Sequence, residues 1–247
     1  MLNFFVAQVS LPTVKVLGYD VASITLQQAC EWALGATQTA EPNLLVTLNP
    51  EIIMAAQTDL TLQAALHAAQ LTVADGVGVV WAAKQVGHTL PERIPGVELV
   101  ETLLAKSGDS LRVYFLGAKP GVAEKAADNV HERYGTVIAG TQHGYFKRPD
   151  DVPDVIGEIS RSGANLLLAG LGEGQEAFLH SNRALLNIPL MIGVGGTLDV
   201  LSGEVTRTPL WTRQLRLEWA YRIASDRSRW HRFPRLIKFA RYVRSTK

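Results

Sequence analysis

The sequence predicts an α/β protein, built on one or two largely parallel sheets with helices on both faces. Short apolar runs of about five residues recur along the chain, each ending at Gly, Asn or Asp, as buried strands do. Longer stretches with helical start signals lie between these runs. The chain has 247 residues and is 47% hydrophobic, which is enough to bury a sizeable core.

The expected elements alternate in type along residues 1–205, which form the predicted α/β body. The strand candidates are residues 13–17, 44–48, 71–74, 112–117, 136–140, 165–170 and 189–194. The helix candidates are residues 50–67, 97–106, 120–134, 150–162 and 174–186. Alternation of this kind favours a parallel sheet. Residues 107–111 (SGDSL) mark an expected joint between two closely packed Rossmann-like lobes, residues 1–108 and 109–205.

Residues 206–247 differ from the body and predict a basic, aromatic-rich helical appendage. This segment holds 12 of the 24 lysines and arginines but only two acidic residues. Within it, residues 234–244 form an amphipathic pattern whose apolar face is expected to comprise Leu236, Ile237, Ala240 and Val243. Such a tail binds phosphates, whether of nucleic acid, anionic lipid or a phosphorylated substrate.

The composition also indicates the cellular compartment of the protein. The single cysteine, Cys30, excludes an intramolecular disulfide framework and favours a reducing compartment. The N-terminal stretch lacks a basic region and a long apolar core, so we do not expect a signal peptide. No apolar run approaches the roughly 20 residues that span a bilayer. We therefore expect a cytoplasmic protein, soluble or attached to a membrane from one side.

Glycine-rich loops follow four of the expected strands, where ligands of parallel sheets bind. None has the spacing of a dinucleotide fingerprint: residues 76–81 (GVGVVW) lack the third glycine, and none is a Walker A motif. Any one of these loops alone is more often a tight strand-to-helix turn, but together they favour a surface of backbone N–H groups suited to a nucleotide diphosphate. No histidines and cysteines have zinc spacing, and no D-x-D pair is present. We therefore expect no metal and no cofactor.

An ordered set of motifs is more specific than any one of these loops. It begins with VTLNPE (46–51), ADGVGVV (74–80) and ERIPG (92–96). It continues through residues 113–130, 144–146, 170–176, 193–203 and 217–232. The set resembles the WecG/TagA/CpsF glycosyltransferases (glycosyltransferase family 26) over about residues 10–235.

The resemblance implies an inverting, metal-independent transfer of an N-acetylmannosamine-type sugar from a UDP-sugar donor. The implied acceptor is an undecaprenyl-diphosphate-linked amino sugar at the inner face of the bacterial plasma membrane. The products would be precursors of teichoic acid or another surface polysaccharide. The tail would then meet the anionic membrane surface, and the protein would be peripheral on it. Self-association into a homo-oligomer is left open.

An inverting transfer needs a general base for the acceptor hydroxyl and positive charge for the leaving diphosphate. Asp75 follows a buried strand and is the expected base; alone, it could equally be a helix cap or turn former. By the resemblance, Thr47, Asn49, Arg93 and Gln175 are expected to bind substrate. The tail arginines expected to reach the diphosphates are Arg216, Arg222, Arg229 and Arg232.

The chain departs from the family pattern at three places. The usual G-x-P-K-Q-E is GEGQE here, the usual F-D is Leu198-Asp199, and the usual R-A-P is Arg207-Thr208-Pro209. These changes most affect two inferences from the family: the role of Gln175 and the identity of the donor sugar. Two other functions stay open: a nucleic-acid-associated protein that grips phosphates with its tail, and a nucleotide-binding oxidoreductase. The acidic body disfavours the first, so we expect no nucleic-acid partner, and the glycine spacings disfavour the second.

Overall fold

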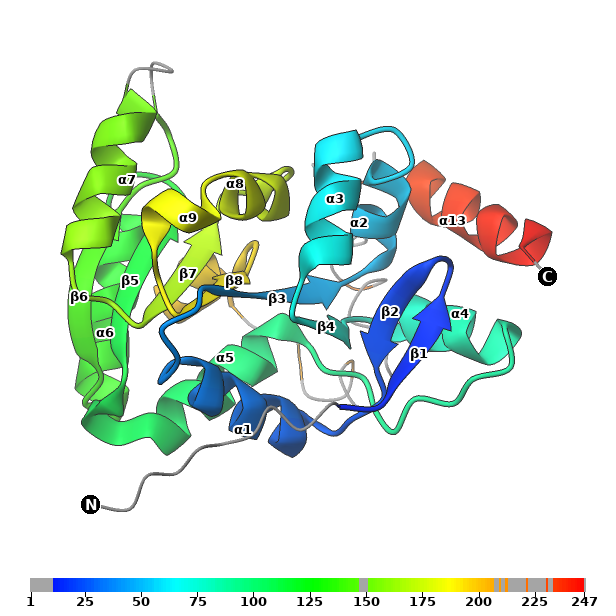
Figure 1. Ribbon diagram of the computed structural model, residues 1–247, viewed down its shortest axis with the longest axis horizontal. Coiled ribbons are helices and arrows are strands. Elements are labelled where there is room, and N and C mark those ends of the chain that lie inside the picture. Colours follow the sequence, from blue (N-terminus) through cyan, green and yellow to red (C-terminus); the bar gives the residue numbers. More distant parts are fainter. Residues whose placement is uncertain are drawn as a thin grey trace.

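A six-stranded sheet forms the centre of the protein, as seen in a computed structural model that describes residues 11–146, 151–206, 209, 212, 221, 230 and 233–246 (Figure 1). The strand order is β4-β3-β8-β7-β5-β6, and every adjacent pair is parallel. The strands are β3 (Asn43–Leu48), β4 (Leu71–Ala74), β5 (Arg112–Gly117), β6 (Val137–Gln142), β7 (Leu166–Gly170) and β8 (Leu190–Gly193).

Helices cover both faces of this sheet. One apolar cluster joins the sheet to α2 (Pro50–Ala55), α3 (Leu60–Ala68), α4 (Val77–Gln85), α7 (Asp151–Arg161), α8 (Gln175–Ser181), α9 (Arg183–Leu186) and α13 (Phe233–Ser245). A second cluster joins the other face to α1 (Leu26–Ala36), α5 (Gly96–Ser107), α6 (Val122–Tyr134) and α10 (Thr197–Leu201). In Figure 1, α2, α3, α7, α8 and α9 lie above the sheet, and α1 and α5 lie below it. The predicted α/β class with helices on both faces is confirmed.

The strands of both halves of the body belong to one continuous sheet. The last strand, β8, lies between β3 of the first half and β7 of the second and pairs with both. At residues 107–111 the chain passes from α5 through a short 3₁₀ turn (Gly108–Ser110) directly into β5. The division into lobes at this joint stays a prediction.

The first strand candidate is a strand outside the parallel sheet. Residues 13–17 supply β1 (Thr13–Val16), which pairs antiparallel with β2 (Tyr19–Ala22), a strand that the apolar pattern did not predict. The two-residue turn between them has positive φ at both Leu17 and Gly18. This is the conformation that matches the twist of a tight hairpin.

Two of the predicted helices are each divided in two. Residues 50–67 form α2 and α3, because the Asp59 carboxylate accepts a hydrogen bond from Leu62 N (2.9 Å) and starts a new helix. Residues 174–186 form α8 and α9, which meet at Asn182, whose side-chain amide donates to Phe178 O (2.8 Å). In both places a short polar side chain competes with helix continuation.

The core strands are buried on both faces. All six residues of β3 are buried, with Leu44, Val46 and Leu48 in one cluster and Leu45 in the other. Cys30 lies on the buried face of α1, and burial raises the pKa of its thiol to about 11. The thiol is therefore a core group.

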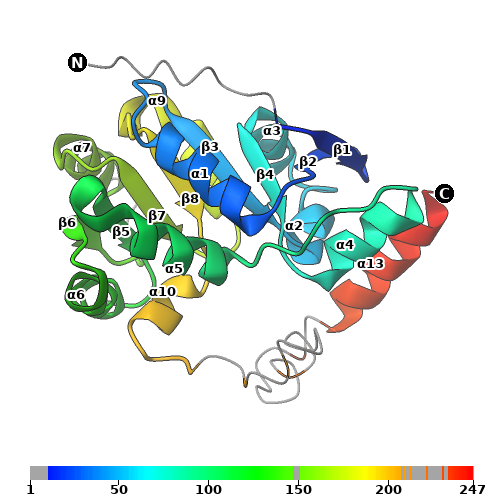
Figure 2. The ribbon, with the colours of Figure 1, turned by 90° about the horizontal axis from the view of Figure 1, so that it is seen from below.

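The C-terminal helix α13 packs against the body. Phe239 (3% exposed) and Val243 (fully buried) lie one helical turn apart, and the Phe239 ring is 6.5 Å from that of Trp81 on α4. Figure 2 shows α13 running beside α4. The predicted apolar face was wrong for Ile237, which is 42% exposed. Phe239 lies next to Val243 on the helical wheel, on the side away from Ile237, and takes the inward place instead.

Candidate functional site

The predicted base Asp75 lies directly beyond the carboxyl end of β4. Its backbone N–H donates to Leu48 O (2.8 Å), which extends the pairing of β4 with β3 by one residue. Its carboxylate Oδ2 accepts a hydrogen bond from Gly96 N (3.3 Å), the first residue of α5. Asp75 therefore caps α5, a helix distant in sequence. The carboxylate is held at the edge of the sheet where ligands of parallel sheets bind.

The segment ERIPG (92–96) contacts this edge through backbone hydrogen bonds and leads into the start of α5. Ile94 N donates to Ala74 O (2.8 Å) at the end of β4. The Glu92 carboxylate accepts a hydrogen bond from Leu26 N at the start of α1. The half-buried Arg93 lies between these two anchored residues. The backbone of the predicted acceptor-binding arginine thus lies beside the strand that carries Asp75.

Thr47 and Asp75 lie on the same side of the sheet edge. A Cβ added to Gly96 would stand 3.3 Å from Thr47 Oγ1, while the backbone N of Gly96 contacts Asp75. Thr47 Oγ1 donates in the other direction to Gly193 O (3.4 Å) at the end of β8. The structure therefore brings Asp75, Thr47 and the end of β8 into one continuous row of contacts.

Asn49 lies one residue beyond β3 and caps α2. Its Oδ1 accepts hydrogen bonds from Glu51 N (2.9 Å) and Ile52 N (3.0 Å). This arrangement, followed by Pro50 at the first helical position, is a strong helix start. Its side-chain oxygen is thus engaged in the cap, and its contact with substrate stays a prediction.

Gln175 and Glu176 form a buried pair at the start of α8, next to the same row of contacts. Gln175 Nε2 donates to Glu176 Oε1 (2.8 Å), and Gln175 Oε1 accepts from Gly195 N (3.0 Å). Burial raises the pKa of the Glu176 carboxyl, against the opposing effect of the hydrogen bond from Gln175. Glu176 was not predicted as a site residue, although it is part of the motif GLGEGQE, because its burial could not be read from the motif.

The glycines of ADGVGVV serve the turn from β4 into α4. Gly76 has φ of +92° at the start of α4, a conformation that favours glycine. Gly78 allows α4 to lie close to Pro50 at the start of α2, because an added Cβ would stand 2.5 Å from Pro50 Cγ. The loop is therefore a tight strand-to-helix turn in which α4 packs against the start of α2.

The variant Gly78→Ala is expected to destabilise the protein by about 1–3 kcal/mol, the usual cost of overpacking. The cause is the clash with Pro50, whose ring is fixed at the start of a helix. Gly35→Ala in α1 is the matched control, since its Cβ would meet nothing within 4 Å. Urea unfolding measures both variants. Equal stability of the two would contradict the close packing of α2 and α4.

The four tail arginines of the sequence analysis, Arg216, Arg222, Arg229 and Arg232, lie outside the described residues. The described part of the tail does reach the site region. Arg235 of α13 forms an ion pair with Glu173, which lies in the loop between β7 and α8, two residues before Gln175. A link between the tail helix and this loop was not predicted, since it joins residues far apart in the sequence.

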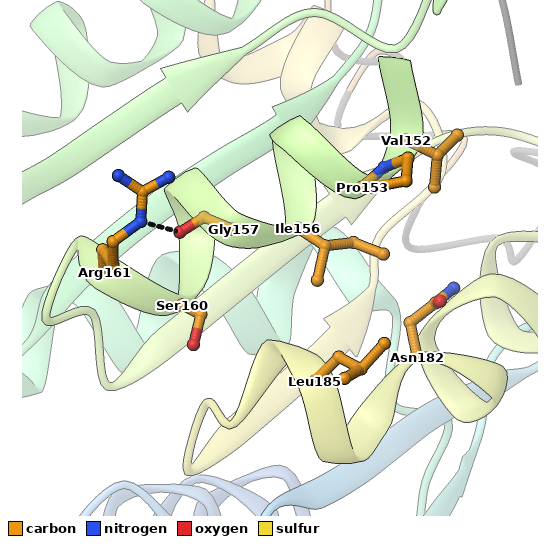
Figure 3. Close-up of a pocket in the computed structure, with 8 residues that line it drawn as sticks. All are labelled: Val152, Pro153, Ile156, Gly157, Ser160, Arg161, Asn182 and Leu185. Atoms are coloured by element: carbon orange, nitrogen blue, oxygen red, sulfur yellow. Dashed lines mark hydrogen bonds between the residues drawn. The ribbon is translucent and has the colours of Figure 1, made fainter. Parts of the chain in front are cut away.

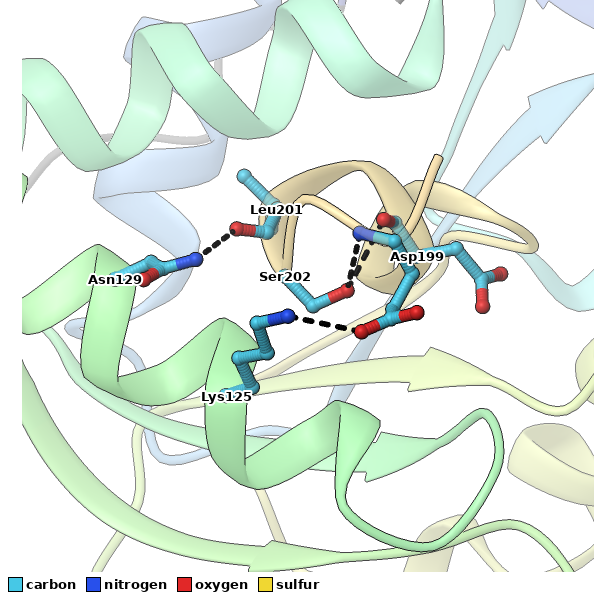
Figure 4. A network of polar contacts seen from close by, with 6 residues as sticks. Lys125, Asn129, Asp199, Leu201 and Ser202 are labelled. Atoms are coloured by element: carbon cyan, nitrogen blue, oxygen red, sulfur yellow. Dashed lines mark hydrogen bonds and ion pairs between the residues drawn. The ribbon is translucent and has the colours of Figure 1, made fainter. Parts of the chain in front are cut away.

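The chain leaves the body at α10, where a polar network fixes it to α6. Lys125 pairs with Glu204 (2.9 Å), and Asn129 Nδ2 donates to Leu201 O (2.9 Å). Figure 4 shows these two side chains of α6 beside the turn at Ser202, whose hydroxyl donates to Asp199 O (3.0 Å). The start of the tail is thereby anchored on the face of the sheet opposite to α13.

A groove of about 590 Å³ lies elsewhere, between α7 and α9. Apolar side chains line most of it, including Ile156 and the 65% exposed Leu185, with Asn182 and Arg161 at its margins (Figure 3). None of the predicted site residues that the structure describes lines this groove. Asp75, Thr47 and Gln175 lie at the sheet edge and not in this cavity.

The described residues lack two further features. In this part of the chain, no three or more His, Cys, Asp or Glu side chains are grouped so as to hold a metal ion. None of the helices described is both long and apolar enough to cross a bilayer.

Comparison with known proteins matches residues 14–247 to the model of the Glycosyl transferase WecG/TagA/CpsF family. Two curated relatives share the name N-acetylglucosaminyldiphosphoundecaprenol N-acetyl-beta-D-mannosaminyltransferase. The one from Bacillus spizizenii is 35% identical over 202 residues, which cover 81% of this chain and 77% of that protein. The one from Staphylococcus aureus (strain MW2) is 33% identical over 227 residues, covering 90% and 87%.

Proposed function

Because the chain belongs to the WecG/TagA/CpsF family of glycosyltransferases, we propose that it transfers an N-acetylmannosamine-type sugar to a lipid-linked acceptor. The acceptor proposed is N-acetylglucosaminyl-diphospho-undecaprenol, after the names of the two relatives. The donor proposed is a UDP-sugar. Such a product is a precursor of teichoic acid or a related cell-surface polysaccharide.

The observation that carries this proposal is the place of Asp75. Its carboxylate lies at the carboxyl edge of the sheet, held by Gly96 N and beside the row formed by Thr47 and the end of β8. A carboxylate has acceptor capacity for several hydrogen bonds. It can therefore stay anchored to α5 and also accept the proton of a substrate hydroxyl.

The proposed reaction is a single displacement at the anomeric carbon of the donor sugar. The acceptor hydroxyl loses its proton to Asp75 while its oxygen forms the new bond to that carbon. The bond from the anomeric carbon to the UDP oxygen breaks, and UDP leaves with the electron pair. Attack from the face opposite to UDP inverts the anomeric configuration. No metal ion takes part, positive charge from the tail arginines stabilises the leaving diphosphate, and Arg93 contacts the acceptor.

The outer face of α13 supports attachment to the membrane that holds the acceptor. While Phe239 and Val243 face the body, the basic residues of this helix are exposed, and Ile237 lies among them. These basic residues are Arg235, Lys238, Arg241 and Arg244. A helix with cations around an exposed apolar side chain suits an anionic lipid surface. We therefore place the protein as a peripheral protein on the inner face of the plasma membrane.

A transfer assay tests the proposed function. Purified protein is incubated with a series of UDP-sugars and a short-chain lipid-diphosphate-GlcNAc acceptor, in the presence of EDTA. We expect a product with one added N-acetylhexosamine and the greatest rate with UDP-N-acetylmannosamine. Absence of product with every donor would refute the proposal, and restoration of activity only by a divalent cation would refute metal independence.

A further inference from the structure

Gln175 and Glu176 are polar side chains with almost no exposure to solvent. Gln175 is 5% exposed and Glu176 is 2% exposed, and they stand side by side at the start of α8. Buried polar groups are costly unless their hydrogen bonds are satisfied. The hydrogen bonds that Gln175 and Glu176 make must therefore offset the cost of burying the two side chains.

The contacts of the Gln175 amide allow one orientation only. Glu176 Oε1 lies 2.8 Å from Gln175 Nε2, so this nitrogen donates to it. Gly195 N lies 3.0 Å from Gln175 Oε1, and a backbone N–H can only donate. A flipped amide would place its NH₂ group against the N–H of Gly195. The Glu176 carboxyl thus selects the orientation in which Gln175 accepts from the loop after β8.

The pair also lies flat against the end of β8. A Cβ on Gly193 would stand 2.7 Å from both Gln175 Nε2 and Glu176 Oε1. The carbonyl of the same Gly193 accepts the hydrogen bond of Thr47 Oγ1 (3.4 Å). The contacts therefore run without a break from Glu176 through Gln175 and the loop at 193–195 to Thr47.

We propose that Glu176 and Gln175 are positioning residues that act on the substrate site through the loop after β8. Glu176 orients the amide of Gln175, and this amide holds Gly195 and thereby the turn against which Thr47 is placed. The Gln175 amide already makes a hydrogen bond within the protein at each end, with Glu176 Oε1 and with Gly195 N, which suits this positioning role. The inference deepens the proposed glycosyltransferase function and rests on it.

The proposal predicts that the hydrogen-bond acceptor at position 176 matters, and its charge does not. Burial raises the pKa of the Glu176 carboxyl, which agrees with a group whose neutral form suits the site. In Glu176→Gln the new amide oxygen can accept from Gln175 Nε2 as the carboxyl does. In Glu176→Leu the shape is similar but the acceptor is lost, and Gln175 Nε2 is left buried without it.

Transfer kinetics and thermal unfolding of four variants test this role. We expect Glu176→Gln to retain at least half of the wild-type kcat/KM, and Glu176→Leu and Gln175→Leu to lose at least tenfold each. The double variant Gln175→Leu/Glu176→Leu should be more stable than Glu176→Leu, because it also removes the buried Gln175 amide that Glu176→Leu leaves without its acceptor. Its activity should stay as low as that of Gln175→Leu, since Gly195 still lacks its acceptor. A double variant that recovers activity together with stability would overturn the proposal, and so would equal losses in Glu176→Gln and Glu176→Leu.

Amide hydrogen exchange at Gly195 gives a second measurement that needs no enzymatic activity. We expect exchange of this amide to be faster in Gln175→Leu and in Glu176→Leu than in the wild type, with Glu176→Gln close to the wild type. Unchanged exchange in Gln175→Leu would overturn the positioning role. If the wild type transfers no sugar while the exchange rates follow this order, the proposed function fails and the positioning of the loop stands. If Glu176→Leu does not fold, the Gly195 exchange rates of Glu176→Gln and Gln175→Leu still test the positioning role.

Discussion

Replacement of Asp75 by Asn is expected to reduce sugar transfer roughly a thousandfold, within the range that a positioned general base contributes. Asn has the same shape, and its Oδ1 can accept the hydrogen bond from Gly96 N as the carboxylate does. The fold and the binding of UDP should therefore be retained. The amide cannot take the proton of the acceptor hydroxyl, so the loss should appear in kcat. Steady-state kinetics, with UDP binding measured by calorimetry, check both parts.

The matched control for this variant is Asp59→Asn. The Asp59 carboxylate also accepts a hydrogen bond from a backbone N–H, that of Leu62 at the start of α3. Asn is about as good a helix cap as Asp, so this variant should keep its stability and its activity. Turnover of Asp75→Asn above a tenth of the wild-type value would remove Asp75 from the role of base.

Shortening the chain after residue 205 is expected to lower transfer to a lipid-linked acceptor on the order of a hundredfold, the effect of losing groups that stabilise developing charge. The deletion removes the four tail arginines proposed to contact diphosphate and the basic face of α13. It also removes Phe239 from its place beside Trp81. Activity is measured with the acceptor in anionic vesicles. Full turnover of the shortened chain would show that the tail is no part of the site.

A full-length variant separates the membrane role of α13 from its packing. Lys238→Glu/Arg241→Glu changes two exposed residues of the outer face and leaves Phe239 and Val243 in place. Co-sedimentation with anionic vesicles should fall at least tenfold, because each cation near such a surface contributes to binding. The control Lys106→Glu/Arg133→Glu changes two exposed residues on α5 and α6. Equal losses in both variants, or tighter binding of the wild type to oligonucleotides than to vesicles, would contradict a membrane-facing α13.

Much of the fold could be predicted because the apolar runs of the strands are a local signal. Runs such as residues 44–48 and 165–170 are buried on both faces, so their sequence is continuous and apolar. The order of the strands was not accessible in this way. The place of β8 between β3 and β7 joins residues about 150 positions apart, and no local pattern encodes such a pairing.

The sequence could predict which residues form the candidate site but not which contacts join them. Asp75, Thr47 and Gln175 were identified from motifs, and the structure brings them to one edge of the sheet. The contact of Asp75 with Gly96, the cap made by Asn49 and the buried place of Glu176 depend on tertiary packing. A motif names the residues that recur, whereas their roles as caps or supports appear only when neighbouring segments are in place.

A crystal structure of the protein with bound UDP would show whether the substrates bind at the carboxyl edge of β3, β4 and β8. We expect electron density for the diphosphate among the loops that follow these three strands, close to the Asp75 carboxylate. Density for UDP in the groove between α7 and α9, with the edge at Asp75 left empty, would contradict it.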